Sequence, residues 1–435
     1  MARTKVARSL AQWVDYIQTL HHREIELSLE RVREVFLRMY PNGLPYKIIS
    51  LSGTNGKGST AELLASIYNQ AGYKVGKFTS PHLVRFNERF NLNGESVDDQ
   101  SLLNAFERVE SSRESTPITF FEYGTLLAID LFAAQQVDVA IMEVGLGGRL
   151  DSVNILDADL AIVTSISIDH TRWLGNSIDE IGFEKVAIAR KGRPLVLGLT
   201  NPPASMLNYA SGLAAQLSRI GQHFDYSYLD GDETWQWSSA ETTIDNLPLP
   251  FRQQGVQLSN CSSALEAVRL MSNYLPADKD SICQGIKNAM ILGRCQLRSR
   301  KPDIVLDVSH NQASVARLSQ FLNSLGNTKI SGEGATFRGR TVAVCGMLRD
   351  KEIEVSLEQI VAQIDDWHVA TIHNDRGSRA SEMSSVISSL CGSTVVEYDR
   401  VQDAYDAALS TLTADDCLVV FGSFHIVGDI LEYIN

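Results

Sequence analysis

The sequence has no excess of positive charge. Its 39 lysines and arginines are outnumbered by 52 aspartates and glutamates, and the net charge is −13 at pH 7. Because no basic field would attract polyanions, we do not expect the surface to bind nucleic acid or an anionic membrane. Any phosphate or carboxylate ligand must instead be held by a few local cations.

Paired cysteines and long apolar runs are also lacking. The six cysteines are scattered without a C-x-x-C pair, which predicts reduced thiols rather than a disulfide framework or a zinc site. Between residues 10 and 20 the apolar pattern is interrupted by Gln12, Asp15 and Gln18, which favours an amphipathic helix over a signal-peptide core. Nothing later in the sequence is long enough to span a bilayer. We expect a cytoplasmic protein, and we expect it to be a monomer.

What the sequence does have is a Gly-rich run, Gly53-Thr54-Asn55-Gly56-Lys57-Gly58-Ser59-Thr60, between a strand-like segment and an apolar helical pattern. Such a turn brings backbone N–H groups and a helix N-terminus to phosphate oxygens. Lys57 supplies a cation for the outer phosphates, and Ser59 or Thr60 a hydroxyl for Mg²⁺. The spacing differs from the standard P-loop, since Gly58 lies between Lys57 and Ser59. The run predicts a nucleotide site, with an ordinary turn as the alternative.

The length of 435 residues exceeds the usual size of a single core and predicts two domains. In the first half, β-rich apolar runs alternate with helix-length segments, which is typical of a largely parallel sheet. These runs span residues 47–51, 74–79, 137–144 and 158–165. Aromatic and polar residues alternate between positions 220 and 250 and predict a small antiparallel side sheet.

A second alternating series predicts a smaller α/β domain. Its apolar runs span residues 303–308, 341–345, 368–372, 394–398 and 417–421. We therefore predict a two-domain α/β protein. A P-loop-type ATPase domain with a mostly parallel sheet and the side sheet occupies residues 1–295, and a Rossmann-like α/β domain occupies residues 296–435. A cleft between two α/β domains is a favoured ligand site.

Polar residues follow several predicted strands, where ligands collect at the carboxyl ends of a parallel sheet. Glu143 closes the third run, and a carboxylate beside a phosphate loop suits a Mg²⁺ ligand. Asp169 and His170 end the run from Leu160 to Ile168, and because an imidazole is a softer ligand than Mg²⁺ prefers, Mn²⁺ would also serve well there. An exposed strand-end glutamate and a packed histidine are the alternatives. In the second domain, the cluster from Asp307 to Asn311 could bind ribose or phosphate, or could cap the next helix.

Together these motifs resemble one family, the folylpolyglutamate synthases of the Mur ligase superfamily, and specifically the bacterial bifunctional dihydrofolate synthase/folylpolyglutamate synthases. The resemblance runs in order over nearly the whole chain. The segments that carry it are 53–59, Ser80-Pro81-His82-Leu83, Phe121-Glu122-Tyr123-Gly124-Thr125, 143–151, Asp169-His170-Thr171, 307–311, Gly346-Met347 and Gly422-Ser423-Phe424-His425.

The resemblance implies an ATP-dependent ligase. ATP would phosphorylate a carboxylate of dihydropteroate or of a reduced folate, and the amine of L-glutamate would attack the acyl phosphate. The implied cofactors are ATP and Mg²⁺, with Mn²⁺ as a substitute and a monovalent cation as a further candidate.

The resemblance also implies roles for individual residues. The catalytic residues would be Lys57, Glu143, His170 and Lys185. The nucleotide would be held by Thr54, Asn55, Gly56, Lys57, Gly58, Ser59, Asn260, Arg294, Asp307 and His310. The metal neighbourhood would comprise Ser59, Ser80, Glu143, His170 and Lys185. The pterin-side contacts would be Glu24, Ile25, Glu26, Leu27, Arg85, Thr119, Phe120, Phe121, Glu122, Leu150, Asp151 and Ser152.

Lys185 matches the lysine that is carbamylated in this family. A carbamate would turn a cation into a carboxylate-like metal ligand, whereas a plain helix-surface lysine is the alternative. Two other functions remain open from the sequence. The first is a monofunctional folylpolyglutamate synthase. The second is a switch protein that hydrolyses ATP without joining substrates.

Overall fold

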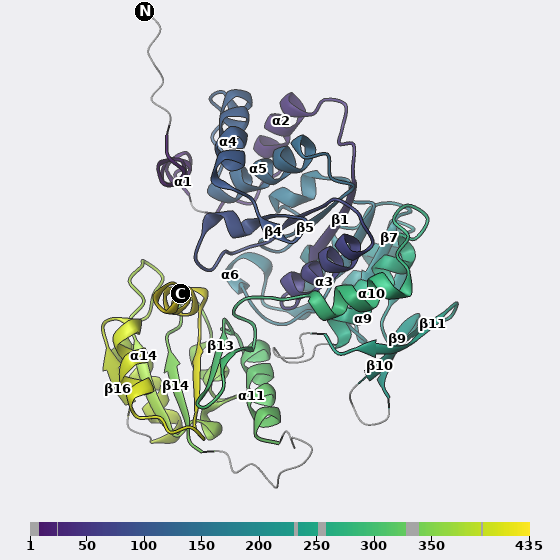
Figure 1. The fold of residues 1–435 in the computed structure, drawn as a ribbon. Coiled ribbons are helices and arrows are strands. Elements are labelled where there is room, and N and C mark those ends of the chain that lie inside the picture. The colour runs from purple at the N-terminus through teal and green to yellow at the C-terminus, as the bar shows by residue number, and fades with distance from the viewer. Residues whose placement is uncertain (1–7, 24, 230–233, 251–257, 328–338, 393–394) are drawn as a thin grey trace, which may run out of the picture. The chain divides into compact units, whose positions relative to one another are not determined.

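The structure, a computed structural model, describes residues 8–23, 25–229, 234–250, 258–327, 339–392 and 395–435 (Figure 1). The chain forms two compact units. The first contains the described residues up to Pro250 and those from 258 to Ala289, and the second runs from Met290 to Asn435. The units thus divide between Ala289 and Met290, against the sequence-based boundary between residues 295 and 296.

The first unit is built on an eight-stranded sheet of order β4-β3-β2-β5-β1-β6-β7-β8. The six strands from β2 to β8 in this order are parallel, and β3 and β4 add an antiparallel edge. The strands are β1 Lys47–Ser52, β2 Val75–Phe78, β3 Phe90–Leu92, β4 Glu95–Ser96, β5 Val139–Glu143, β6 Leu160–Val163, β7 Pro194–Leu197 and β8 Gln216–Arg219. Strand β1, which enters the Gly-rich run, lies between β5 and β6.

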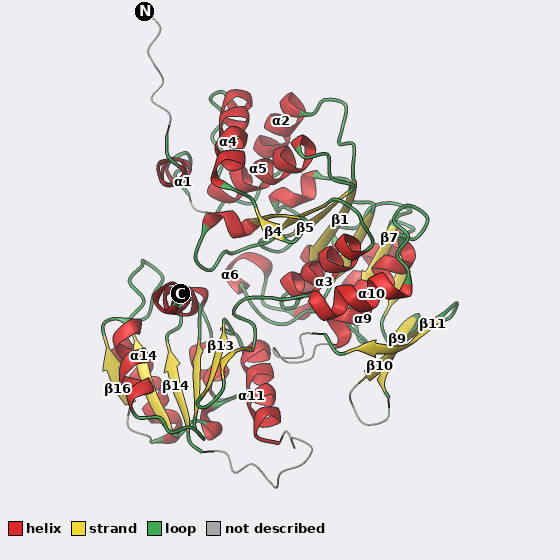
Figure 2. Ribbon diagram, in the orientation of Figure 1, coloured by secondary structure: helices red, strands yellow, loops and turns green. Residues whose placement is uncertain are grey.

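Helices cover both faces of this sheet, as Figure 2 shows, with α2, α4 and α5 on one side and α3, α9 and α10 on the other. The helices are α1 Leu10–Thr19, α2 Glu30–Met39, α3 Lys57–Gln70, α4 Asp99–Arg113, α5 Phe120–Ala134, α6 Thr171–Leu174, α7 Ile178–Val186, α8 Ala204–Gly212, α9 Leu258–Leu270 and α10 Lys279–Asn288. Two 3-10 helices, η1 Phe86–Arg89 and η2 Ser152–Ile155, lie in the loops beyond strands.

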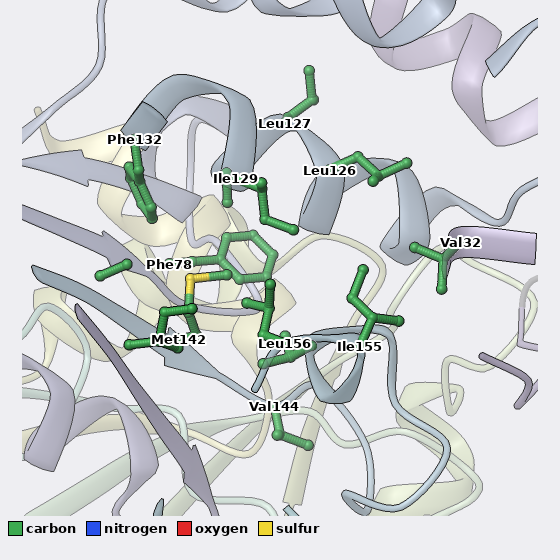
Figure 3. Close-up of a cluster of buried hydrophobic side chains, with 14 of the residues drawn as sticks. Val32, Phe78, Leu126, Leu127, Ile129, Phe132, Met142, Val144, Ile155 and Leu156 are labelled. Carbon is green, nitrogen blue, oxygen red and sulfur yellow. The ribbon is translucent and has the colours of Figure 1, made fainter. Parts of the chain in front are cut away.

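The core between the sheet and α5 is apolar. Phe78 and Met142 from the strands meet Leu126, Ile129 and Phe132 from α5, all of them fully buried (Figure 3). Burial of a side chain of this size stabilises the fold by about 1.5–3 kcal/mol. This packing anchors the carboxyl ends of β2 and β5, which lead to Ser80 and Glu143.

The side sheet and the second unit follow the predicted pattern. The side sheet is antiparallel, with β9 Phe224–Tyr228, β10 Thr234–Ser239 and β11 Thr243–Pro248. Aromatic and polar residues alternate along β10 because Trp235 and Trp237 are buried on one face of this sheet.

The second unit has a six-stranded sheet of order β12-β13-β17-β14-β15-β16, parallel except for the edge strand β12. Its strands are β12 Gln296–Ser299, β13 Asp303–Asp307, β14 Thr341–Cys345, β15 Asp366–Ala370, β16 Val395–Tyr398 and β17 Cys417–Phe421. Its helices are α11 Gln312–Asn327, α12 Ile353–Leu357, α13 Ala380–Cys391, α14 Val401–Ser410 and α15 Phe424–Ile434, with the 3-10 helix η3 Val361–Gln363.

The two-domain α/β fold predicted from the sequence is confirmed. Residue 394, the first of the predicted run 394–398, lies outside the described residues. In the described part of the chain, every helix is too short or too polar to cross a bilayer.

Candidate active site

The Gly-rich run connects the end of β1 to the start of α3, as the sequence predicted. Gly56 caps α3 with φ +87°, and Gly53 has φ +148°, both values that favour glycine. A Cβ at Gly56 would lie 2.5 Å from the Asn260 side-chain oxygen, and one at Gly53 would lie 2.0 Å from Thr164 Oγ1. Glycine is therefore required at both positions. At Gly56 the reason is that α9 places the Asn260 side chain directly against the loop.

The loop is braced by the residues that follow β6. Thr54 N–H donates to the Ser165 carbonyl at 2.8 Å, and Asn55 N–H donates to Ser165 Oγ at 3.0 Å. The hydroxyls of Thr164 and Ser165 both donate to the Asn55 carbonyl, at 2.7 and 2.9 Å. These bonds fix the loop backbone in advance, which is what a preorganised phosphate site requires.

Two lysines converge on the loop. Lys57 Nζ donates to the carbonyls of Gly53, at 2.9 Å, and Thr54, at 3.3 Å. Lys185, from the last turn of α7, is buried and donates to the same Gly53 carbonyl at 3.1 Å. Burial, reinforced by the charge of Lys57, lowers the pKa of Lys185 to about 7. Lys185 is thus not a helix-surface lysine.

Three of the predicted metal ligands, Ser59, Ser80 and Glu143, lie around the same loop. The register pairs Leu51 of β1 with Glu143 of β5, so the Glu143 carboxylate stands beside the loop. Glu143 is buried, and its Oε2 accepts the Ser80 N–H at 3.2 Å. A Cβ on Gly58 would lie 3.8 Å from that same Oε2. Ser59, in the first turn of α3, is buried as well.

This donor set fits Mg²⁺ or Mn²⁺, because a carboxylate and hydroxyls are the hard oxygen ligands that both ions accept. His170 caps α6 with φ +52°, and its Nε2 lies 3.9 Å from Asp169 Oδ2. Among the described residues, no group of three or more His, Cys, Asp and Glu side chains could hold a metal alone.

Asp151 has an evident structural role. Its Oδ2 accepts the N–H groups of Gly145 and Leu146, at 3.1 and 2.9 Å, and its Oδ1 accepts that of Val153 at 3.0 Å. Burial raises the pKa of this carboxyl to about 6 despite these hydrogen bonds. Asp151 therefore shapes the glycine turn after β5, and Ser52 Oγ ties the turn to β1 by donating to the Gly147 carbonyl at 2.7 Å.

Two of the predicted pterin-side segments meet through a residue that sequence reasoning missed. Arg31 of α2 donates from Nη1 to Glu26 Oε1 at 2.7 Å and from Nη2 to Glu122 Oε1 at 3.0 Å. Glu122 Oε2 accepts the Thr119 N–H at 2.7 Å, which completes a capping box at the start of α5. Glu24, the first residue of the predicted pterin-side segment 24–27, lies outside the described residues.

The third predicted segment also packs against α5. Ser152 Oγ lies 2.6 Å from Thr125 Oγ1, and a Cβ on Gly145 would lie 2.5 Å from the Phe121 ring. Arg85 differs, because it is exposed and pairs with Asp99 at 2.9 Å. Ile25, Leu27, Phe120 and Leu150 are half-buried.

The predicted nucleotide residues of the second unit gather at the end of β13. Asp307 is buried and accepts the N–H groups of Cys295, at 2.6 Å, and Ser309, at 2.7 Å. Arg294 and His310 both lie against Phe424, the first at 4.9 Å from the ring centroid and the second with ring centroids 6.2 Å apart.

Comparison with known proteins places this chain and its fold in one class. The Mur ligase middle domain matches residues 51–222, and the Mur ligase glutamate ligase domain matches residues 293–424. The dihydrofolate synthase/folylpolyglutamate synthase of Escherichia coli is 39% identical over 431 residues, covering 99% of this chain and 97% of its own. That of Haemophilus influenzae is 34% identical and covers 98% of this chain and 97% of its own.

Solved structures agree. The Escherichia coli FolC structure in complex with DHPP and ADP has a TM-score of 0.90, 39% identity and 98% coverage of both chains. The bifunctional Yersinia pestis enzyme, complexed with AMPPNP and Mn ion, has a TM-score of 0.88, 35% identity and 98% coverage of both chains. The chain belongs to the dihydrofolate synthase/folylpolyglutamate synthase family of the Mur ligases.

Proposed function

We propose that this protein is an ATP-dependent ligase that adds L-glutamate to dihydropteroate, giving dihydrofolate, and to reduced folates, giving folylpolyglutamates. The observation that carries this function is the pairing of β1 with β5, which sets Glu143 beside the phosphate loop. The packing of Phe121 on Gly145 joins that same turn to the pterin-side helix α5.

The reaction transfers the γ-phosphoryl group of ATP to the acceptor carboxylate and releases ADP. The glutamate amine then attacks the acyl carbon, loses a proton and expels inorganic phosphate. Lys57 and the loop N–H groups hold the phosphates, and loop contacts to Thr164 and Ser165 keep that cradle rigid. A bound Mg²⁺ would supply positive charge that stabilises the transferring phosphoryl group. Ser59, Glu143, Ser80 and His170 are its proposed protein neighbours.

Lys185 is proposed to react with carbon dioxide. A neutral amine attacks carbon dioxide, and one proton is lost, which leaves a carbamate with two oxygen atoms. The lowered pKa of Lys185 makes the neutral amine available near pH 7. The carbamate oxygens are suited to a second Mg²⁺.

We propose further contacts to ATP and to the pterin from residues outside the phosphate loop. Asn260, Arg294, Asp307 and His310 are assigned to the adenine, ribose and phosphates of ATP on the resemblance. The pterin-side assignments of Glu24 to Leu27, Arg85, Thr119 to Glu122 and Leu150 to Ser152 rest on it as well. We also place the protein in the cytoplasm, since all six cysteines are free thiols.

ATP turnover measured with and without acceptors tests the proposed function. ADP release should require both L-glutamate and either dihydropteroate or a reduced folate. If L-glutamate is present and turnover occurs with reduced folates but not with dihydropteroate, the protein is a monofunctional folylpolyglutamate synthase. Undiminished turnover without any acceptor would identify an ATP-hydrolysing switch.

A further inference from the structure

Arg89 is a buried cation whose hydrogen-bonding capacity the fold leaves largely unused. It ends η1 and is only 9% exposed. Its Nε donates to His82 Nδ1 at 2.8 Å. Within the described part of the chain, Nη1 and Nη2 have no hydrogen-bond acceptor and no carboxylate within 4.0 Å. Neither is among the fully buried polar atoms that lack a partner, so both keep access to solvent.

The Arg89 guanidinium lies near one predicted pterin-side residue and near one predicted metal ligand. Its Cζ lies 5.2 Å from the ring centroid of Phe120, in the predicted pterin-side segment. Glu143, the predicted metal ligand, is close enough for its charge to oppose the loss of the Arg89 proton. Burial lowers the pKa of Arg89 only to about 10, so the side chain stays cationic at neutral pH.

We propose that Arg89 binds the carboxylate of the acceptor substrate and holds it where it receives the phosphoryl group. This inference rests on the proposed function and adds to it a substrate-contacting residue. A guanidinium with two adjacent free N–H groups matches a carboxylate in a planar, bidentate geometry. The pterin ring then extends towards Phe120, and the carboxylate faces the metal side.

A buried cation without an acceptor is costly unless a ligand completes it. Arg113, on α4, shows the ordinary solution. It is 7% exposed, and Nε, Nη1 and Nη2 all donate, to Glu110, to Tyr16 and to the Thr116 carbonyl. Arg113 therefore serves as a matched control. Its replacement also removes a buried guanidinium, but one whose hydrogen bonds go to the protein and which is not proposed to bind substrate.

The test compares two ligands in the full-length protein with ADP and Mg²⁺ present. One is dihydropteroate, and the other is its analogue with hydrogen in place of the carboxylate. Wild type should bind dihydropteroate more tightly by roughly 10- to 100-fold, the value of a desolvated charge-assisted pair. In Arg89→Gln this ratio should fall close to one, and KM for dihydropteroate should rise while KM for ATP stays unchanged. Arg113→Gln should lower the melting temperature and keep the ratio.

Arg89→Lys provides a second variant should the glutamine protein fold poorly. Lysine keeps the positive charge but cannot bind a carboxylate with two parallel N–H groups. The affinity ratio of this variant should therefore fall between those of wild type and Arg89→Gln. A ratio equal to that of wild type in either variant overturns the proposal, because Arg89 would then act only on packing. Failure of the proposed function looks different, since wild type itself would then form no glutamate adduct.

Discussion

Lys57 and Lys185 donate to one and the same acceptor, the carbonyl oxygen of Gly53, at 2.9 and 3.1 Å. Burial makes protonation of Lys185 costly, and repulsion by the like charge of Lys57 adds to that cost. The loop thus brings together one lysine proposed to hold the nucleotide and one lysine whose pKa is lowered to about 7. This division of roles underlies the first three predictions.

Lys57→Ala should abolish ligation while the fold remains intact. The loss of one charge-assisted contact to a transferring phosphoryl group is worth roughly 3 kcal/mol, or about a hundredfold or more in rate. The measurement is kcat for dihydrofolate formation, with circular dichroism as the control for folding. Near-normal turnover in a folded variant would remove Lys57 from the phosphate site.

Lys185→Ala should be nearly inactive, and acetate should restore part of its activity by occupying the vacated space with a carboxylate. Lys185→Arg should not respond to acetate, because it keeps a bulky cation where an anion is needed. The measurement is the initial rate across an acetate titration. Full activity of Lys185→Arg would show that a plain cation suffices at this position.

Carbamate formation on Lys185 should depend on pH with a midpoint near 7. The folded protein lowers the pKa of this amine from its ordinary value of 10.5 to about 7. Protonation below that pH removes the nucleophilic lone pair, so the carbamate should decline as the pH falls from 8 to 6. Carbon NMR with labelled bicarbonate measures the carbamate signal, and Lys185→Ala identifies it. A signal that is absent at pH 8 contradicts the prediction.

Asp151→Asn should destabilise the turn after β5. An amide nitrogen cannot accept the N–H groups that the carboxylate holds, so at least one of those of Gly145, Leu146 and Val153 loses its partner. The expected cost is about 1–3 kcal/mol of unfolding free energy, measured by chemical denaturation. Asp157→Asn is the control, because that side chain is 92% exposed. Equal stability losses in the two variants would refute a special role for Asp151.

Local patterns made the fold and the phosphate loop predictable. The apolar runs that form the strands of a parallel sheet can be recognised in short stretches of sequence. The same holds for the glycines at positions 53 and 56. Pairings across long sequence separations leave none, which is why the Arg31 bridge between Glu26 and Glu122 was missed. The environment of Arg89 could not be read from the sequence either, since its burial arises only when η1 packs against the start of α5.

The most direct test of the whole account follows one oxygen atom. Dihydropteroate with a carboxylate labelled with oxygen-18 is incubated with ATP, L-glutamate and Mg²⁺, and the released inorganic phosphate is analysed by mass spectrometry. If the carboxylate is phosphorylated and then attacked by the amine, each phosphate molecule carries one labelled oxygen and each ADP is matched by one dihydrofolate. Unlabelled phosphate would mean that water, not the acceptor carboxylate, receives the phosphoryl group, and would contradict the assignment of this protein as a ligase.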